Sequence, residues 1–168
     1  IGVYYYRQAH DPEKIIQQAE KSCKEGKYQE AMKYCLRAEI LILDKKNKHT
    51  EEYASLLLKK GKIHYFLNQF DESQKCSVLA RDIFIALNWQ EGIMAADVNI
   101  GELAFIHKQY PNAIFFLHEA LAANEKIKYL SESNQCHAQW YLALSYYHLK
   151  KYNEAEAEFY KCLDLVSN

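Results

Sequence analysis

The chain has 168 residues, of which 49 % are apolar and 26 % charged, the composition of a globular protein of about one domain. Its 21 Lys and Arg residues balance 22 Asp and Glu residues, so it lacks the basic surface typical of nucleic-acid binding and the charge block of a membrane-surface helix. With only 5 Gly and 2 Pro, it is poor in the turn residues that a β-rich domain needs. These counts favour helices joined by short connections.

The sequence predicts an all-α chain of eight helices. Residues 1–11, which contain three consecutive tyrosines, are expected to finish a preceding helix or arm. The helices are expected at about 12–25, 28–44, 51–67, 70–87, 92–108, 111–128, 132–149 and 152–166. Successive helices would form four antiparallel hairpins within residues 12–168, at about 12–47, 48–90, 91–130 and 131–168.

An aromatic residue followed three positions later by a small residue recurs four times. The pairs are Tyr28 and Ala31, Phe70 and Ser73, Tyr110 and Ala113, and Tyr152 and Ala155, with steps of 42, 40 and 42 residues between the aromatics. Other small residues keep the same phase: Ala38, Ala80, Ala120 and Cys162 seven positions after the first small residue, and Ala19, Gly61, Gly101 and Ala143 nine positions before the aromatic. Small residues allow two antiparallel helices to cross closely, where a larger side chain would cost ~1–3 kcal/mol.

The residues around each aromatic are expected to form the turn of each hairpin. Gly26, Asn68 and Asn153 are turn-forming residue types that neighbour three of the aromatics. Pro111 falls at the expected first helical position, where its missing N–H costs nothing.

These phrases resemble the tetratricopeptide repeat (TPR) over roughly residues 12–166. The common TPR unit has about 34 residues, so steps of 40–42 residues would lengthen each helix by about one turn. The pattern is similar to the long-repeat branch of kinesin light chains, Pins-type spindle adaptors and bacterial TPR regulators, and the phrase at 99–104 is most like the bacterial regulators. The resemblance implies a right-handed α-solenoid that binds proteins or peptides and is not an enzyme.

The resemblance also implies a binding groove on the concave face, lined by the first helix of each hairpin. The candidates form three trios spaced i, i+4, i+7 on one helical face, with two adjacent residues. They are Leu58, Lys62 and Tyr65; Val98, Glu102 and Phe105; Trp140, Leu144 and Tyr147; and the adjacent Asn99 and Tyr141. Each could equally be a core residue, and Trp140 is the strongest candidate because Trp is enriched in binding hot spots.

The best-known TPR groove holds a C-terminal carboxylate between Lys and Asn residues. Among the matching positions of this sequence only Lys62 suits that role, so a chaperone-tail receptor is not expected. The groove is more apolar and aromatic, which suits an amphipathic helix or a hydrophobic peptide.

Catalytic and cofactor sites are not expected. The five cysteines are odd in number and have no CxxC spacing, so we expect free, mostly buried thiols, which favour a reducing compartment such as the cytoplasm. The seven histidines form no metal-binding motif, and the sequence has no Gly-rich phosphate loop and no Ser/His/Asp grouping. The sequence therefore predicts no metal, no cofactor and no catalytic residue.

Two functions remain open from the sequence. The first is a protein-binding or peptide-binding scaffold within a larger protein, without nucleic-acid or membrane binding by this segment. The alternative is a regulatory segment of a signalling or transcription regulator that binds a signal peptide or dimerises. A homodimer could form through an uncapped last helix, where Phe159, Leu163 and Val166 would be exposed.

Overall fold

The structure, a computed structural model, describes residues 11–45 and 48–167, without the side chains of residues 45, 166 and 167. The helix or arm expected at the start falls on residues 1–10, outside these ranges. The described part holds eight α-helices and no strand: α2 (Pro12–Lys24), α3 (Tyr28–Lys45), α4 (Glu51–Phe66), α5 (Phe70–Ala86), α6 (Gln90–Ile106), α7 (Tyr110–Ile127), α8 (Glu132–His148) and α9 (Tyr152–Ser167). All eight predicted helices are confirmed, with ends that differ by at most two residues.

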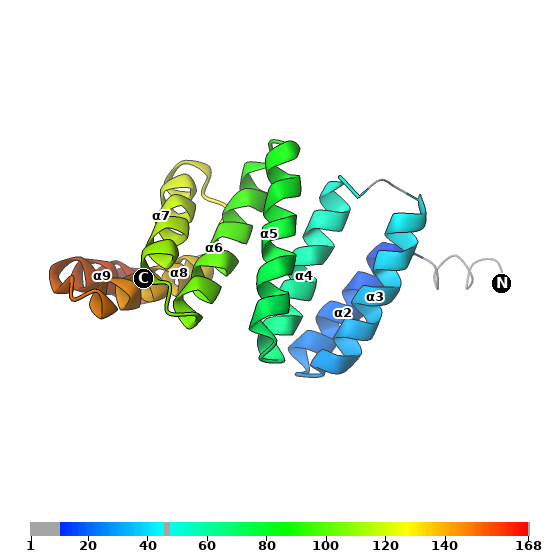
Figure 1. Cartoon of the computed structure of the whole chain (residues 1–168), viewed down its shortest axis with the longest axis horizontal. Coiled ribbons are helices and arrows are strands. Elements are labelled where there is room, and N and C mark those ends of the chain that lie inside the picture. The colour runs from blue at the N-terminus through cyan, green and yellow to red at the C-terminus, as the bar shows by residue number, and fades with distance from the viewer. Residues whose placement is uncertain (1–10, 46–47, 168) are drawn as a thin grey trace. The chain divides into compact units, whose positions relative to one another are not determined.

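The helices are arranged in hairpins within two compact units, Ile1–Asn88 and Trp89–Asn168. In the first unit α2 packs on α3, α4 packs on α5, and α3 contacts α4 (Figure 1). In the second unit α6 packs on α7, α8 packs on α9, and α8 also contacts α6 and α7. Consecutive helices are therefore the main packing partners in each unit.

Side-chain caps fix the start of three of the four first helices. The side chain of Asp11 accepts a hydrogen bond from the backbone N–H of Glu13 at the start of α2. Thr50 and Ser131 cap α4 and α8 in the same way. Each cap satisfies one of the N–H groups that the first turn of a helix leaves without an intrahelical partner.

The turn inside each hairpin uses a left-handed residue two positions before the repeated aromatic. These residues are Gly26 (φ 72°), Asn68 (φ 59°), Lys108 (φ 59°) and Lys150 (φ 61°). Gly and Asn adopt this conformation readily, whereas a lysine adopts it at a cost. Asn153 lies inside α9, so its expected role as a turn former is wrong: the register, and not the residue type, selects Lys150 for the fourth turn.

Close crossing of the helices in each hairpin explains the small residues of the repeat. A Cβ atom added at Gly101 of α6 would lie 2.5 Å from Cγ of Leu117 on α7. A Cβ added at Gly61 of α4 would lie 3.2 Å from Oγ of Ser77 on α5. The hydroxyl of Ser73 donates a hydrogen bond of 2.8 Å to the carbonyl oxygen of Gly61, which joins the two backbones at this point.

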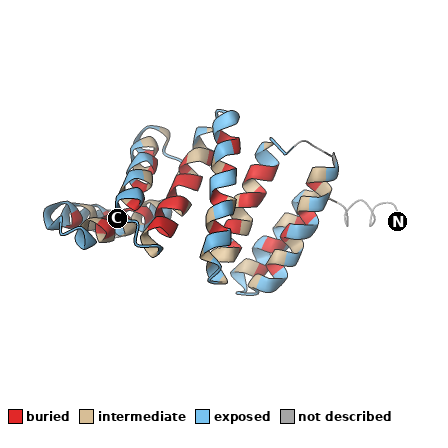
Figure 2. Ribbon diagram, in the orientation of Figure 1, coloured by how far each residue is buried: buried red, intermediate tan, exposed pale blue. Residues whose placement is uncertain are grey.

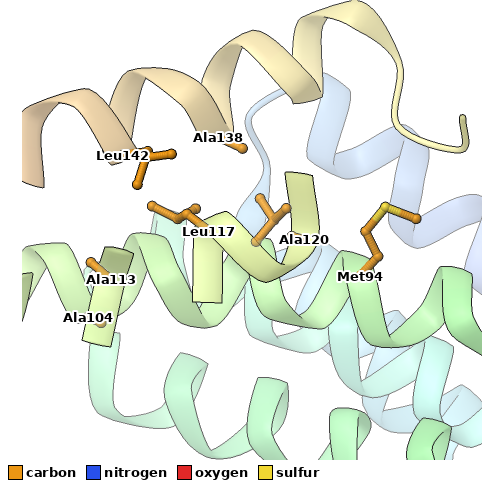
Figure 3. Packing of buried hydrophobic residues seen from close by; sticks show 8 residues of the cluster. Met94, Ala104, Ala113, Leu117, Ala120, Ala138 and Leu142 are labelled. Atoms are coloured by element: carbon orange, nitrogen blue, oxygen red, sulfur yellow. The ribbon is translucent and has the colours of Figure 1, made fainter. Parts of the chain in front are cut away.

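Buried residues recur along the helices of both units (Figure 2). In the second unit eight of them form a cluster, in which Leu142 and Ala138 of α8 face Leu117 and Ala120 of α7 (Figure 3). Met94 of α6 belongs to the same cluster. Three helices thus share this core, because each apolar stripe must be covered by its neighbours.

A largely buried ion pair joins the two hairpins of the first unit. The ammonium of Lys60 on α4 lies 2.7 Å from a carboxylate oxygen of Glu39 on α3. The hydroxyl of Tyr53 donates to the other oxygen of the same carboxylate at 3.4 Å. Burial, together with the charge of Glu39, raises the pKa of Tyr53, so this hydroxyl remains a hydrogen-bond donor at neutral pH.

Candidate functional site

The first helices of the hairpins carry the candidate binding surface. On α4, the predicted residues are a half-buried Leu58, an exposed Lys62 and a half-buried Tyr65. The ring of Tyr65 lies edge-on to Phe66, with 5.7 Å between the ring centroids, and at the same distance from Phe70. The phenol is thus held by the aromatic residues of its own hairpin.

The second unit brings four side chains of α6 and α8 into one connected strip: Glu102, His137, Tyr141 and Phe105, here called the α6–α8 strip. Nδ1 of His137 lies 2.8 Å from Oε1 of Glu102. The ring of His137 contacts Tyr141 edge-on at 5.0 Å, and Tyr141 contacts Phe105 at 5.2 Å. A buried carboxylate, a half-exposed imidazole and two aromatic rings therefore follow one another across two helices.

Trp140 and Tyr147 are the most exposed of the predicted residues on α8, at 48 % and 55 %. The indole of Trp140 packs edge-on against Phe159 of α9, with 5.1 Å between the rings. Tyr147 contacts Tyr152 at 5.5 Å. Leu144, between them on the helix, is half-buried. Each of the two rings thus packs against an aromatic residue of α9 and remains about half exposed.

Val98 offers little surface to a partner, which corrects its inclusion among the candidates. Only 7 % of Val98 is exposed, and it belongs to the core cluster that also contains Ala138 and Leu142 of α8. Its neighbour Asn99 is half-buried and stays a candidate. Glu102 is buried as well, but its carboxylate pairs with the imidazole of His137, which is exposed.

The sequence-based choice missed three residues beside these candidates. His137 lies four positions before Tyr141 on α8, so helical spacing from that tyrosine would have found it. The rings of Tyr110 and His148 stack at 4.6 Å, and both lie 5.7 Å from Phe105. Because Tyr110 begins α7 and His148 ends α8, only the packed structure shows that this stacked pair adjoins the strip.

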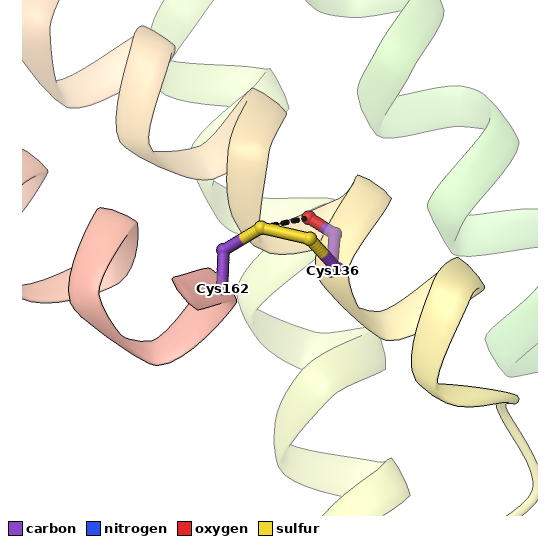
Figure 4. The surroundings of a disulfide bond; sticks show 2 residues. All are labelled: Cys136 and Cys162. Atoms are coloured by element: carbon purple, nitrogen blue, oxygen red, sulfur yellow. Dashed lines mark hydrogen bonds between the residues drawn. A yellow bond between two sulfur atoms is a disulfide. The ribbon is translucent and has the colours of Figure 1, made fainter. Parts of the chain in front are cut away.

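A disulfide joins Cys136 of α8 to Cys162 of α9, with 4.6 Å between their Cα atoms (Figure 4). The expectation of five free thiols is therefore wrong, and the argument from them to a reducing compartment loses its premise. The two cysteines are separated by 26 residues and meet because α8 and α9 are antiparallel neighbours. Beside the disulfide, Trp140 and His137 help to line a hollow of about 410 Å³.

The three free cysteines are poor nucleophiles. Burial raises the pKa of the Cys35 thiol to about 11. Burial also raises the pKa of Cys23 and of Cys76. Because the thiolate is the reactive form, thiols of this kind remain largely protonated and react slowly at neutral pH. Within the described ranges, no group of three or more His, Cys, Asp or Glu side chains could hold a metal ion.

Solved structures with the same helical arrangement come from several repeat proteins. BtubC (BKLC) from P. vanneervenii matches with a TM-score of 0.81 and 15 % identity over 93 % of this chain and 63 % of that one. TPR-like repeats of a kinesin light chain from Podosopora anserina match with a TM-score of 0.70 and 13 % identity over 95 % of this chain and 73 % of theirs. The chain has a TPR-like fold.

A Rap protein complexed with Competence and Sporulation Factor shares the TPR-like fold, with a TM-score of 0.76 and 17 % identity over 92 % of this chain. The chain spans 42 % of the Rap protein's length and 63 % of the length of BtubC. No protein-family model matches the sequence, and no curated protein does. None of the described helices of this TPR-like chain combines the length and apolar character needed to cross a membrane.

Proposed function

We propose that this chain is a protein-interaction module that binds a peptide or a partner helix on the faces of its first helices. The α6–α8 strip is the observation that supports the proposal. In it the Glu102 carboxylate pairs with His137, and the rings of His137, Tyr141 and Phe105 contact one another in sequence across two neighbouring helices. Aromatic residues contribute much of the binding energy at protein interfaces, since they bury a large area at a small entropic cost. The TPR-like fold supports the proposal, and so does the Rap neighbour, which was solved with a bound factor.

The surface formed by α6 and α8 is apolar and aromatic, which favours a partner with apolar side chains. Trp140 and Tyr147 expose large rings, and α6 and α8 contain no Lys or Arg. An amphipathic helix or an extended peptide with apolar anchors would bury these rings and leave its polar side in water.

Selection of peptides on the isolated chain tests the proposal. Dissociation constants of the selected peptides would be measured for the wild type, Trp140→Ala, Tyr141→Ala and a control, Phe115→Ala. Phe115 is an aromatic of the second helix α7 with 56 % exposure, so the control removes a comparable ring from a different surface. Thermal unfolding of each variant shows that the fold is retained.

We expect Trp140→Ala or Tyr141→Ala to weaken binding by about tenfold or more, as is typical for an interface hot spot. The control should bind as the wild type does. If only Phe115→Ala weakened binding, the second helices would carry the site and the proposal would be wrong. Equal binding by all four proteins would also contradict it.

A regulatory segment that dimerises is the second candidate. Tyr160 and Leu163 of α9 are 59 % and 55 % exposed, which is the surface that a second copy could cover. Phe159 is half-buried beneath Trp140, and the side chain of Val166 lies outside the described residues. Sedimentation equilibrium with and without a selected peptide distinguishes the two: a monomer in both conditions would reject dimerisation.

A further inference from the structure

The first unit holds a pocket that the proposed binding strip does not include. It has a volume of about 260 Å³ and lies between α2 and α4, the first helices of their hairpins. This volume equals roughly nine water molecules at their share of liquid volume, and it is below the usual range for cofactor pockets. A pocket of this size suits one or two side chains of a peptide.

The floor of the pocket is apolar. Ala19 of α2, Cys35 of α3 and Ile63 of α4 line it, and all three are buried. One wall is the ring of Phe66, which is 43 % exposed and stacks on Tyr28 with 4.7 Å between the rings and 10° between their planes. The stacked pair holds this wall in place, so the pocket presents a defined apolar surface.

The rim of the pocket is positively charged. Three lysines line it, Lys24, Lys59 and Lys62, together with one carboxylate, Glu20. Lys59 forms an ion pair with Glu20. Within the described residues, Lys24 and Lys62 have no carboxylate within ion-pair distance, and both are exposed. Two ammonium groups without an ion-pair partner in the described part of the chain therefore lie at the mouth of the pocket.

The charge of the rim also acts inside the pocket. The pKa of the Cys23 thiol, which lies in the pocket wall, is raised by burial and by the charge of Glu20, although the ammonium groups of Lys62 and Lys59 lower it. A negative charge is therefore disfavoured at the depth of this thiol. An anionic group at the exposed mouth of the pocket would meet the ammonium of Lys62 without that cost of burial.

We propose that the pocket between α2 and α4 binds an acidic side chain, Asp or Glu, of a partner peptide whose neighbouring apolar side chain rests on the floor. The two free ammonium groups complement the carboxylate, and the buried floor with Phe66 complements the apolar side chain. This inference rests on the proposed function, in which a peptide binds to the faces of the first helices. It adds a requirement for acidic residues that the α6–α8 strip does not impose.

Charge-reversal variants test the acidic requirement. The probes are two fluorescent synthetic peptide pools of Glu with Leu and Phe or of Gln with Leu and Phe, and binding is measured by anisotropy. The variants are Lys24→Glu with Lys62→Glu, and a control Lys33→Glu with Lys48→Glu. The control residues are exposed, lie in the same unit outside the pocket, and change the net charge equally.

We expect the Glu pool to bind the wild type at least tenfold more tightly than the Gln pool does. Reversal of Lys24 and Lys62 should remove this difference, and the control variant should keep it. The proposal is overturned if the Glu pool does not bind, if both pools bind equally, or if the control loses as much binding as the pocket variant. In those cases net charge or another surface would explain any binding.

Alkylation of Cys23 by iodoacetamide at about pH 9, where more of the thiol is ionised than at neutral pH, locates the bound peptide directly. Peptide mass mapping would compare Cys23 with Cys76, a free cysteine of the same unit that does not line the pocket. The Glu pool should slow alkylation of Cys23 at least tenfold and leave Cys76 unchanged, and unchanged alkylation of Cys23 would overturn the pocket. Equal protection by inorganic phosphate would overturn the peptide assignment. Binding that is lost in Trp140→Ala but kept in the pocket variant would overturn this inference while leaving the proposed function intact.

Discussion

Replacement of Gly101 by alanine tests the close crossing of α6 and α7. Alanine is a better helix former than glycine by ~1 kcal/mol, so helix propensity alone predicts a more stable protein. The new Cβ, however, would lie 2.5 Å from Cγ and 2.8 Å from Cδ2 of Leu117, which is fully buried. Cγ is the branch point of that side chain and cannot move without moving the whole leucine.

The clash should outweigh the gain in helix propensity. Overpacking of a core costs ~1–3 kcal/mol, and a contact this short belongs at the upper end of that range. We therefore expect Gly101→Ala to lower the free energy of unfolding by about 1–2 kcal/mol after the gain of ~1 kcal/mol from helix propensity. At Gly61 the new Cβ would lie 3.2 Å from Oγ of Ser77, a terminal atom that can rotate. Gly61→Ala should be close to neutral or slightly stabilising.

Urea unfolding measures both variants. The two tryptophans are Trp89 and Trp140, both in the second unit, so their fluorescence reports on the unit that contains Gly101. Far-UV circular dichroism reports on both units and is the readout for Gly61→Ala. The Leu117→Ala background provides the control, because it removes Cγ and Cδ2 from the contact.

In the Leu117→Ala background, Gly101→Ala should become stabilising by up to ~1 kcal/mol, since the side-chain clash is gone and only the 3.3 Å approach to the backbone nitrogen of residue 117 opposes the gain in helix propensity. Equal destabilisation in both backgrounds would show that Leu117 is not the cause. Unchanged or increased stability of Gly101→Ala alone would refute the close crossing.

Three further outcomes are expected. Lys150→Gly should raise the urea midpoint by the equivalent of ~0.5–1 kcal/mol, because Lys150 has φ 61° and glycine adopts this conformation without strain; an unchanged midpoint contradicts this. Reduction of the Cys136–Cys162 disulfide, which spans 26 residues, should lower the stability of the second unit by ~3 kcal/mol in fluorescence-detected unfolding, and a Cys136→Ser variant should be insensitive to the reductant. The pKa of Cys35 is raised by burial to about 11, so the folded chain keeps a proton that the unfolded chain releases; stability should fall as the pH rises from ~9 toward this value, with a smaller slope in Cys35→Ala.

In the hairpin turns, some left-handed residues can be predicted from their residue type and others only from their position in the repeat. Gly26 and Asn68 can be identified as turn residues by type alone, because both tolerate a left-handed backbone. Lys108 and Lys150 cannot be identified in this way, but they hold the same place two residues before the repeated aromatic. The repeat therefore predicts the turn even where the local residue opposes it, since the packing of two helices determines the backbone between them.

The candidate site was predicted less completely than the helices. Leu58, Val98 and Trp140 occupy equivalent repeat positions, yet the first is half-buried, the second is in the core and the third is 48 % exposed. Helical spacing gives the face of a residue but not what covers that face. Lys62 is the one predicted residue that also lines the lysine-rimmed pocket. Lys59 lies three positions before it on α4, so helical spacing would have found it, whereas Lys24 meets the pocket from α2.

The sequence by itself determined the repeat, the eight helices and the small residues at each crossing, because these follow from the spacing of residues along one chain. Only the tertiary structure decided which side chains come together from separate helices. The Cys136–Cys162 disulfide, the pairing of Glu102 with His137 and the lysine-rimmed pocket all join residues 26 or more positions apart. Such contacts depend on how neighbouring helices pack, and periodicity along a single helix carries no information about the residue on the facing one.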